Sequence, residues 1–133
     1  MSIPSQPPIH YGYASASDVT WSRSEKAIAR QAFDAALKRE LHELMQEAKE
    51  IARKIKQPSD LWDLQEYLTQ RRQEIDYKYN YRYSHLTQVF GRLLYETRVS
   101  EEELRGFSED KLKTIHSFAR FLAEDAPDLH SER

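Results

Sequence analysis

The sequence of 133 residues contains no cysteine. This absence excludes disulfide bonds, thiolate nucleophiles and zinc sites with cysteine ligands. Glycine occurs only three times, so the chain has no glycine-rich loop to cradle a phosphate and few places for tight hairpin turns. Pro58 is the only proline between Pro8 and Pro127, and two long stretches therefore carry no helix breaker.

Neither sign of charge dominates, because the chain has 20 lysines and arginines and 22 aspartates and glutamates, which gives a net charge of −2. This balance argues against a nucleic-acid binder that depends on phosphate neutralisation. No apolar run approaches the roughly 20 residues of a membrane span. Residues 1–20 lack the basic start and apolar stretch of a signal peptide. We therefore expect one soluble, cytoplasmic domain with no membrane span and no nucleic-acid partner.

The composition is rich in alanine, leucine, glutamate, lysine and arginine, which predicts an all-α fold. Residues 1–20 hold prolines and serines without an apolar period, and we expect a disordered N-terminal arm there. A helical domain should cover residues 21–123, followed by a flexible tail over 124–133.

The first helix should start at Ser22, because Ser22 and Glu25 have capping-box spacing, and it should run to Lys56. Its apolar stripe recurs at alternating steps of four and three residues: Leu37, Leu41, Leu44, Ala48, Ile51 and Ile55. A helix of this length spans about 50 Å. A compact chain of this size is only about 36 Å across. The helix must therefore protrude, and an exposed apolar stripe marks an association surface.

The second helix should run from Asp60 to about Tyr79, with Ser59 or Asp60 as its N-cap. Its stripe has the same spacing but contains two polar members: Leu61, Gln65, Leu68, Arg72, Ile75 and Tyr79. Together the two helices predict a long stem (residues 22–80) that dimerises. A smaller head (residues 81–123) should contain about three helices.

Within the head, a third helix is expected over residues 83–98. Ser100 and Glu103 form a second capping box, which opens a short helix that Gly106 ends. Ser108 should cap the last helix. The core face of that helix is predicted from its apolar spacing: Leu112, Ile115, Phe118, Ala119 and Leu122.

Arg72 is the least expected member of the second stripe, since it lies between Leu68 and Ile75. One interpretation is a surface arginine whose aliphatic side-chain carbons pack along apolar neighbours. The other is an interface residue, because polar groups in an apolar stripe set register and oligomeric state. Trp62 and Glu66 lie on the neighbouring stripe. Trp62 supplies an aromatic anchor, and Glu66 is an acid that could form an ion pair with Arg72 of a symmetric partner. We favour the interface.

Catalytic and metal-binding patterns are not evident. The five histidines show no metal-ligand spacing, and no nucleophile motif or phosphate loop is present. We therefore expect a protein that is not an enzyme and uses no cofactor or metal. Residues 76–83 alternate tyrosines with polar and basic residues, a composition that suits base stacking. A tyrosine-lined joint between stem and head is the alternative, and the acidic net charge favours it.

Several motifs resemble the cyanobacterial fluorescence recovery protein family. In the stem they are Trp21-Ser22, Lys38-Arg39-Glu40-Leu41, Asp60-Leu61-Trp62 and Arg72-Gln73-Glu74-Ile75-Asp76-Tyr77-Lys78-Tyr79. In the head they are Val89-Phe90, Glu102-Glu103-Leu104 and Asp110-Lys111 before Ile115. The resemblance runs from Trp21 to about Arg120, and the order and spacing of the motifs carry it.

The resemblance implies an all-helical homodimer that binds the photoactivated orange carotenoid protein, through that partner's C-terminal domain. Binding would speed the partner's return to its inactive orange form and restore phycobilisome fluorescence. The expected place is the cytoplasm, at the cytoplasmic face of thylakoids if the source is cyanobacterial. An alternative is a helical adaptor dimer of the same scaffold that serves a different client in an organism without this photoreceptor.

The resemblance also implies site residues. The family residues matching Trp62 and Arg72 belong to a patch at the dimer interface, where Gln65 and Glu66 stand in place of a histidine and an aspartate. The interface and partner-binding set is therefore Leu61, Trp62, Gln65, Glu66, Leu68 and Arg72. In the head, Gln88 stands where the family has an aromatic implicated in partner contact, and Thr114 stands where it has a lysine. The head contact set is Gln88, Phe90, Lys111 and Thr114.

Overall fold

The computed structural model describes residues 20–125, in which four α-helices and one short 3₁₀ helix form. The elements are α2 (Arg23–Arg53), α3 (Pro58–Lys78), α4 (Leu86–Tyr95), η3 (Glu102–Leu104) and α5 (Glu109–Asp125). No strand forms among these residues, and the predicted all-α class is confirmed. The predicted arm, apart from Thr20, and the predicted tail, apart from two residues at the end of α5, lie outside the described residues.

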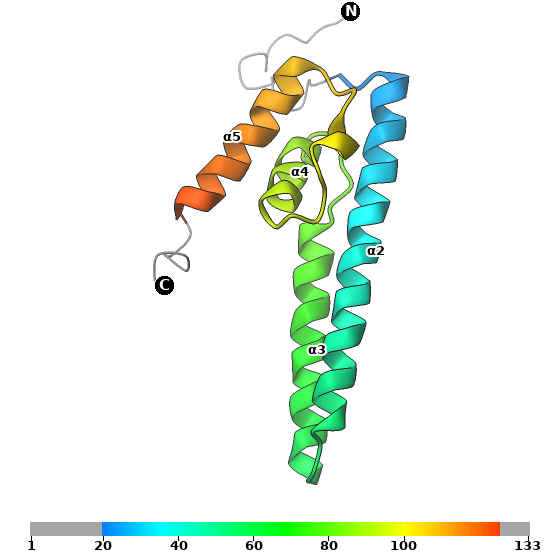
Figure 1. Ribbon diagram of the computed structural model, residues 1–133, viewed down its shortest axis with the longest axis vertical. Helices are drawn as coiled ribbons and strands as arrows, with labels where there is room; N and C mark the ends of the chain where they lie inside the picture. Colours follow the sequence, from blue (N-terminus) through cyan, green and yellow to red (C-terminus); the bar gives the residue numbers. More distant parts are fainter. Residues whose placement is uncertain (1–19, 126–133) are drawn as a thin grey trace, which may run out of the picture.

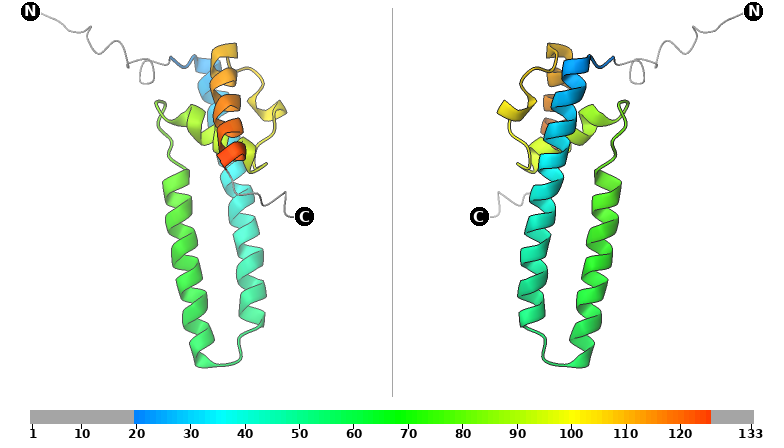
Figure 2. Two further views of the ribbon diagram at one scale, coloured as in Figure 1. Left: turned by 90° about the vertical axis from the view of Figure 1, so that its left-hand side faces the viewer. Right: turned by 90° about the vertical axis from the view of Figure 1, so that its right-hand side faces the viewer.

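Helix α2 runs through the whole length of the molecule (Figure 1). Its C-terminal half pairs with the antiparallel α3, and the two form a long hairpin, here residues 37–78, that points away from the remaining helices (Figure 2). Helices α4, η3 and α5 gather around the N-terminal half of α2. Within the described residues, none of the helices is both long enough and apolar enough to cross a membrane.

The apolar core lies inside the head and draws one wall from α2. That wall consists of small and aromatic residues at helical spacing: Ala29, Ala32, Phe33 and Ala36. Phe90 and Leu93 of α4 and Ile115 of α5 are buried against it. The core therefore crosses the boundary expected near residue 80, because residues 29–36 of the predicted stem belong to the core of the head.

The first cap is where the sequence predicts it. Ser22 Oγ accepts the backbone N–H of Glu25, and the Glu25 carboxylate accepts the N–H of Ser22. The second cap differs, since α3 begins at Pro58 with Gln57 as N-cap, and Asp60 accepts the Gln57 N–H at 3.1 Å. Proline fits the first helical position because its fixed φ is helical and its missing N–H would have no partner there.

The third helix is shorter than predicted at both ends, because residues 83–85 and 96–98 are not α-helical. The whole segment 79–85 between α3 and α4 is not helical. In this segment Tyr79 and Tyr81 lie two residues apart and both pack edge-on against Phe33 of α2, with ring centroids 5.3 and 4.8 Å away. Tyr83 contacts Trp21 in a tilted arrangement, with ring centroids 5.7 Å apart. These tyrosines therefore follow an extended alternation and line the joint between the hairpin and the head.

The second capping box forms as expected, with Glu103 N–H donating to Ser100 Oγ. Gly106 has φ +110° and ends this turn. Of the predicted core face of α5, only Ile115 is fully buried. Helix α5 crosses α4 at Gly91, where a Cβ atom would lie 2.9 Å from Phe118 Cβ, and the rest of α5 extends outward (Figure 1).

Candidate functional site

Helix α3 has one inward side and is otherwise open to solvent, with Ile75 its only buried residue. The inward side is fixed by contacts with α2: the Tyr67 hydroxyl donates to Glu47, and Arg71 Nη2 lies 3.3 Å from Glu40. A hairpin of two helices has no further layer to cover its sides. Its exposed apolar residues therefore form a surface of the kind that marks association sites.

One side of the hairpin carries a set of residues that each follow an inward-facing one. Leu41 and Met45 on α2 follow Glu40 and Leu44, while Leu68, Arg72 and Gln65 on α3 follow Tyr67, Arg71 and Leu64. Each step turns the side chain by about 100° around its helix. Because the two helices are antiparallel, equal turns bring both sets to the same side. With Leu61, one turn before Gln65, these residues form what we call the stem face: Leu41, Met45, Leu61, Gln65, Leu68 and Arg72.

The apolar members of the stem face are exposed, although they are large. Trp62 follows Leu61 and lies at the outer edge of this face with 64% of its surface exposed. Arg72 is 84% exposed, and its Nε lies 3.8 Å from the Asp76 carboxylate. Glu66 shares the stripe of Trp62, one turn further on, and does not contact Arg72 within the chain. That these residues meet across a dimer stays a prediction.

A second group of functional interest was not predicted. Glu40 is only 1% exposed, and four groups surround its carboxylate. The Tyr79 hydroxyl donates to Oε1 at 2.9 Å, Lys78 Nζ lies at 2.9 Å, and Arg98 Nε and Arg71 Nη2 lie at 3.2 and 3.3 Å. Lys78 and Arg98 also contact the Glu96 carboxylate, at 2.8 and 3.0 Å. We call this set the Glu40 cluster: Glu40, Arg71, Lys78, Tyr79, Glu96 and Arg98.

Electrostatics in the Glu40 cluster favour the ionised carboxylate. Burial by itself would raise the pKa of Glu40, but hydrogen bonds from Lys78 and Tyr79 and the charges of Lys78 and Arg98 hold this pKa below its ordinary value. Burial and the adjacent Glu40 carboxylate raise the pKa of Tyr79 above its ordinary value. A sequence signal was present, since Glu40 lies four residues after Ala36 and continues the helical spacing of the core positions Phe33 and Ala36.

The four head candidates divide into two pairs. Gln88 and Thr114 are exposed and line one hollow of about 560 Å³ with Phe118 and Phe121. Phe90 is fully buried in the core, and Lys111 is buried beneath Trp21 with its ammonium 3.2 Å from Glu25 Oε1 and 2.6 Å from the Thr20 carbonyl. Phe90 and Lys111 therefore have no surface to offer a partner in this fold, and the expectation of direct contact is corrected for both.

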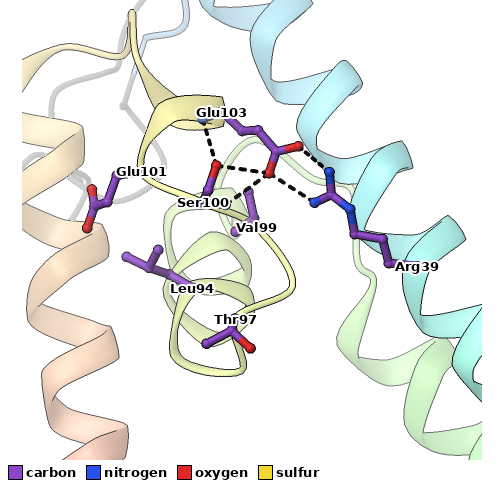
Figure 3. A pocket seen from close by; sticks show the side chains of 7 residues that line it. All are labelled: Arg39, Leu94, Thr97, Val99, Ser100, Glu101 and Glu103. Carbon is purple, nitrogen blue, oxygen red and sulfur yellow. Dashed lines mark hydrogen bonds and ion pairs between the residues drawn. The ribbon is translucent and has the colours of Figure 1, made fainter.

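Another hollow, of about 570 Å³, lies between α2 and the segment that follows α4. Figure 3 shows its polar wall, where the Arg39 guanidinium forms a two-bond contact with the Glu103 carboxylate. Leu94 and Val99 also line it. Arg39, the charged donor in this lining, is paired within the chain. The described residues include no cluster of histidine, aspartate and glutamate that could hold a metal ion.

Comparison with known proteins covers both the stem face and the Glu40 cluster. Residues 21–119 match the family described as photoprotection regulator fluorescence recovery protein. The chain belongs to the fluorescence recovery protein family. The fluorescence recovery protein of Synechocystis sp. is 39% identical over 103 residues, which are 77% of this chain and 94% of that protein.

Solved structures of the fluorescence recovery protein family have the same fold. The fluorescence recovery protein of Fremyella diplosiphon superposes with a TM-score of 0.72 at 39% identity, over 76% of this chain and 99% of that one. The Synechocystis protein gives the same TM-score at 40% identity, with the same coverage. The family regulates photoprotection, and this chain is accordingly a regulatory protein that acts on a photoprotection partner.

Proposed function

We propose that this chain forms a homodimer through the stem face, binds the photoactivated orange carotenoid protein and accelerates its return to the inactive orange form. Membership of the fluorescence recovery protein family supports the choice of partner class. The observation that carries the dimer is the stem face itself: four large apolar side chains and Arg72 exposed on one side of a hairpin that has no second layer.

A dimer would supply the missing layer. Two hairpins packed face to face make a four-helix arrangement, in which apolar residues from both helices of each hairpin are covered. Trp62, at the edge of the face, would then anchor the interface, since tryptophan and arginine are the residues most often found as interface anchors. The dimer presents two heads at its ends, and each head keeps its exposed hollow at Gln88 and Thr114.

Acceleration follows if the dimer binds the inactive-like arrangement of the partner more favourably than the active one, because a ligand shifts an equilibrium only by its differential affinity. The test mixes the protein with illuminated orange carotenoid protein and follows the red-to-orange absorbance change in the dark. We expect a faster return at micromolar concentrations of the protein, and no effect from heat-denatured protein.

An unchanged rate with several orange carotenoid proteins would reject this function. The protein would then be a helical adaptor dimer with another client. Light scattering on the same sample separates the two halves of the proposal: a dimer that leaves the rate unchanged rejects only the partner, whereas a monomer rejects the role of the stem face.

A further inference from the structure

The Glu40 cluster lies at the point where the apolar core of the head ends and the hairpin begins. On α2, Ala36 is fully buried in the core, and Glu40 follows one turn later. The cluster joins three parts of the chain that are distant in sequence: the middle of α2, the end of α3 with Tyr79, and the loop after α4 that carries Glu96 and Arg98. Figure 1 shows these parts converging where α3 meets the head.

Apart from the packing of Tyr79 on Phe33, few contacts hold helix α3 in place at this end. Ile75 is its only buried residue, and the remaining inward residues, Arg71 and Lys78, bind α2 through the Glu40 carboxylate. Buried ion pairs add little net stability compared with apolar packing, since desolvation offsets much of the attraction. Charge-assisted hydrogen bonds are directional, however, and fix the relative position of the groups they join. The cluster therefore governs where α3 lies more than how stably the chain folds.

The stem face depends on that position. Leu41 directly follows Glu40, and Arg72 directly follows Arg71, so the pairing of Glu40 with Arg71 sets how the two helices present their exposed residues. A slide or rotation of α3 along α2 would separate Leu41 and Met45 from Leu68 and Arg72. A flat apolar surface that spans both helices exists only in one register.

We propose that Glu40 is a positioning residue: buried within the chain, it holds α3 in register with α2 and thereby assembles the stem face. This inference rests on the proposed function, in which the stem face is the dimer surface. Loss of the Glu40 charge leaves Arg71, Lys78 and Arg98 close together with fewer acids to pair them, and the end of α3 moves away from α2.

The absence of cysteine allows a direct distance measurement. Spin labels at introduced cysteines replacing the exposed Lys38 and Gln73 report on the hairpin at its head end, and labels replacing Lys49 and Asp63 report on the end near the turn. Dilution with unlabelled chain leaves only distances within one protomer. In Glu40→Gln we expect the 38–73 distribution to broaden and lengthen, while the 49–63 distribution stays unchanged.

Dimerisation is measured on the same variants without labels by sedimentation equilibrium. Glu40→Gln should raise the dimer dissociation constant at least tenfold, and Glu40→Asp, which keeps the charge, should recover part of the loss. The matched control is Glu50→Gln, the same change on the same helix, at an exposed residue that binds Arg53. The control should leave both distances and the dissociation constant unchanged.

Each outcome decides the inference. Unchanged distances in Glu40→Gln overturn it, even where the melting temperature falls, because the cluster would then be merely structural. If Glu40→Gln fails to fold, Tyr79→Phe and Arg71→Met remove one contact each and must widen the 38–73 distance in turn, or the inference is rejected. If the unaltered chain is a monomer, the proposed dimer fails, whereas the distances still test whether Glu40 holds α3 in register.

Discussion

At the scale of single residues, Arg72 tests the stem face most directly. A guanidinium that enters a dimer interface must meet acceptors such as Gln65, Glu66 or a backbone carbonyl of the partner, because a desolvated lone charge costs too much. Arg72→Glu removes the donors and, in the proposed dimer, adds a like charge near the partner's Glu66. Loss of a well-made buried pair costs about 3–5 kcal/mol, enough to dissociate a dimer of micromolar affinity.

We therefore expect Arg72→Glu to be a monomer by light scattering, with its far-UV helicity largely kept, since glutamate forms helices as readily as arginine. Arg53→Glu, an equal change near the hairpin turn, should leave the dimer intact. A fully dimeric Arg72→Glu at micromolar concentration would mean that Arg72 is a solvated side chain outside the interface.

Lys111 was expected to contact a partner, but in the structure it is buried and pairs with Glu25. The Lys111 ammonium donates a hydrogen bond to the Glu25 carboxylate, which also accepts the backbone N–H groups of Ser22 and Ser108. Lys111→Met leaves Glu25 buried without its cation, and breaking such a pair destabilises a protein by about 3 kcal/mol. Urea unfolding should show this loss, whereas Lys113→Met, an exposed neighbour on α5, should change stability little. Equal midpoints for the two variants would contradict the assigned role.

At the scale of elements, the crossing of α4 and α5 is set by Gly91. A Cβ atom there would lie 2.9 Å from Phe118 Cβ and 3.0 Å from the Ile115 carbonyl oxygen. Gly91→Ala forces α5 outward, and overpacking of this kind costs about 1–3 kcal/mol. We expect a lower urea midpoint and faster hydrogen exchange in α5. Ser117→Ala, at an exposed position of α5, is the control. A stability of Gly91→Ala equal to that of the unaltered chain would reject the close approach.

Most elements could be predicted from local patterns. The Ser22 and Ser100 capping boxes are short-range hydrogen-bond motifs, and the sequence reveals them in full. The segment 79–85 could not be predicted, because Tyr79, Tyr81 and Tyr83 fit either a helical or an extended spacing until their packing on α2 decides. The same holds for Lys111 and Phe90, since nothing local shows that α5 folds back over the start of α2 or that α4 is central.

The candidate site divides in a similar way. Leu61, Trp62 and Arg72 are visible as an apolar stripe with a cation in it, which requires only the period of one helix. The partners of Glu40 could not be predicted, because Tyr79 and Arg98 lie 39 and 58 residues further along the chain. No spacing rule connects positions so far apart.

At the scale of the whole molecule, carboxylates with lowered pKa values make stability depend on pH. Besides Glu40, the pKa of Glu25 is held below its ordinary value: burial would raise it, but the N–H groups of Ser22 and Ser108 and the Lys111 ammonium outweigh burial. The hydrogen bond from Arg39 lowers the pKa of Glu103. A carboxylate with a lowered pKa in the folded state stabilises the protein above its unfolded pKa and loses that contribution as the pH falls through the folded value.

We accordingly expect the free energy of unfolding to be nearly constant above about pH 5.5 and to fall progressively below about pH 4.5, the ordinary range of a glutamate pKa. Thermal unfolding at matched ionic strength between pH 7 and pH 3 measures this. Glu103→Gln should flatten part of the acidic slope. A melting temperature that stays constant down to pH 3 would show that these carboxylates are not held in their ionised form.

Helix α2 is one uninterrupted rod of 31 residues that serves as a wall of the head core at one end and as half of the hairpin at the other. Such a rod is about 46 Å long at 1.5 Å per residue. It acts as a lever: a tilt of about 5° imposed at the tip of the hairpin displaces the core wall at the far end by about 4 Å over that length. A tilt of the hairpin would therefore be carried to the head by the helix itself, without any change of secondary structure in between.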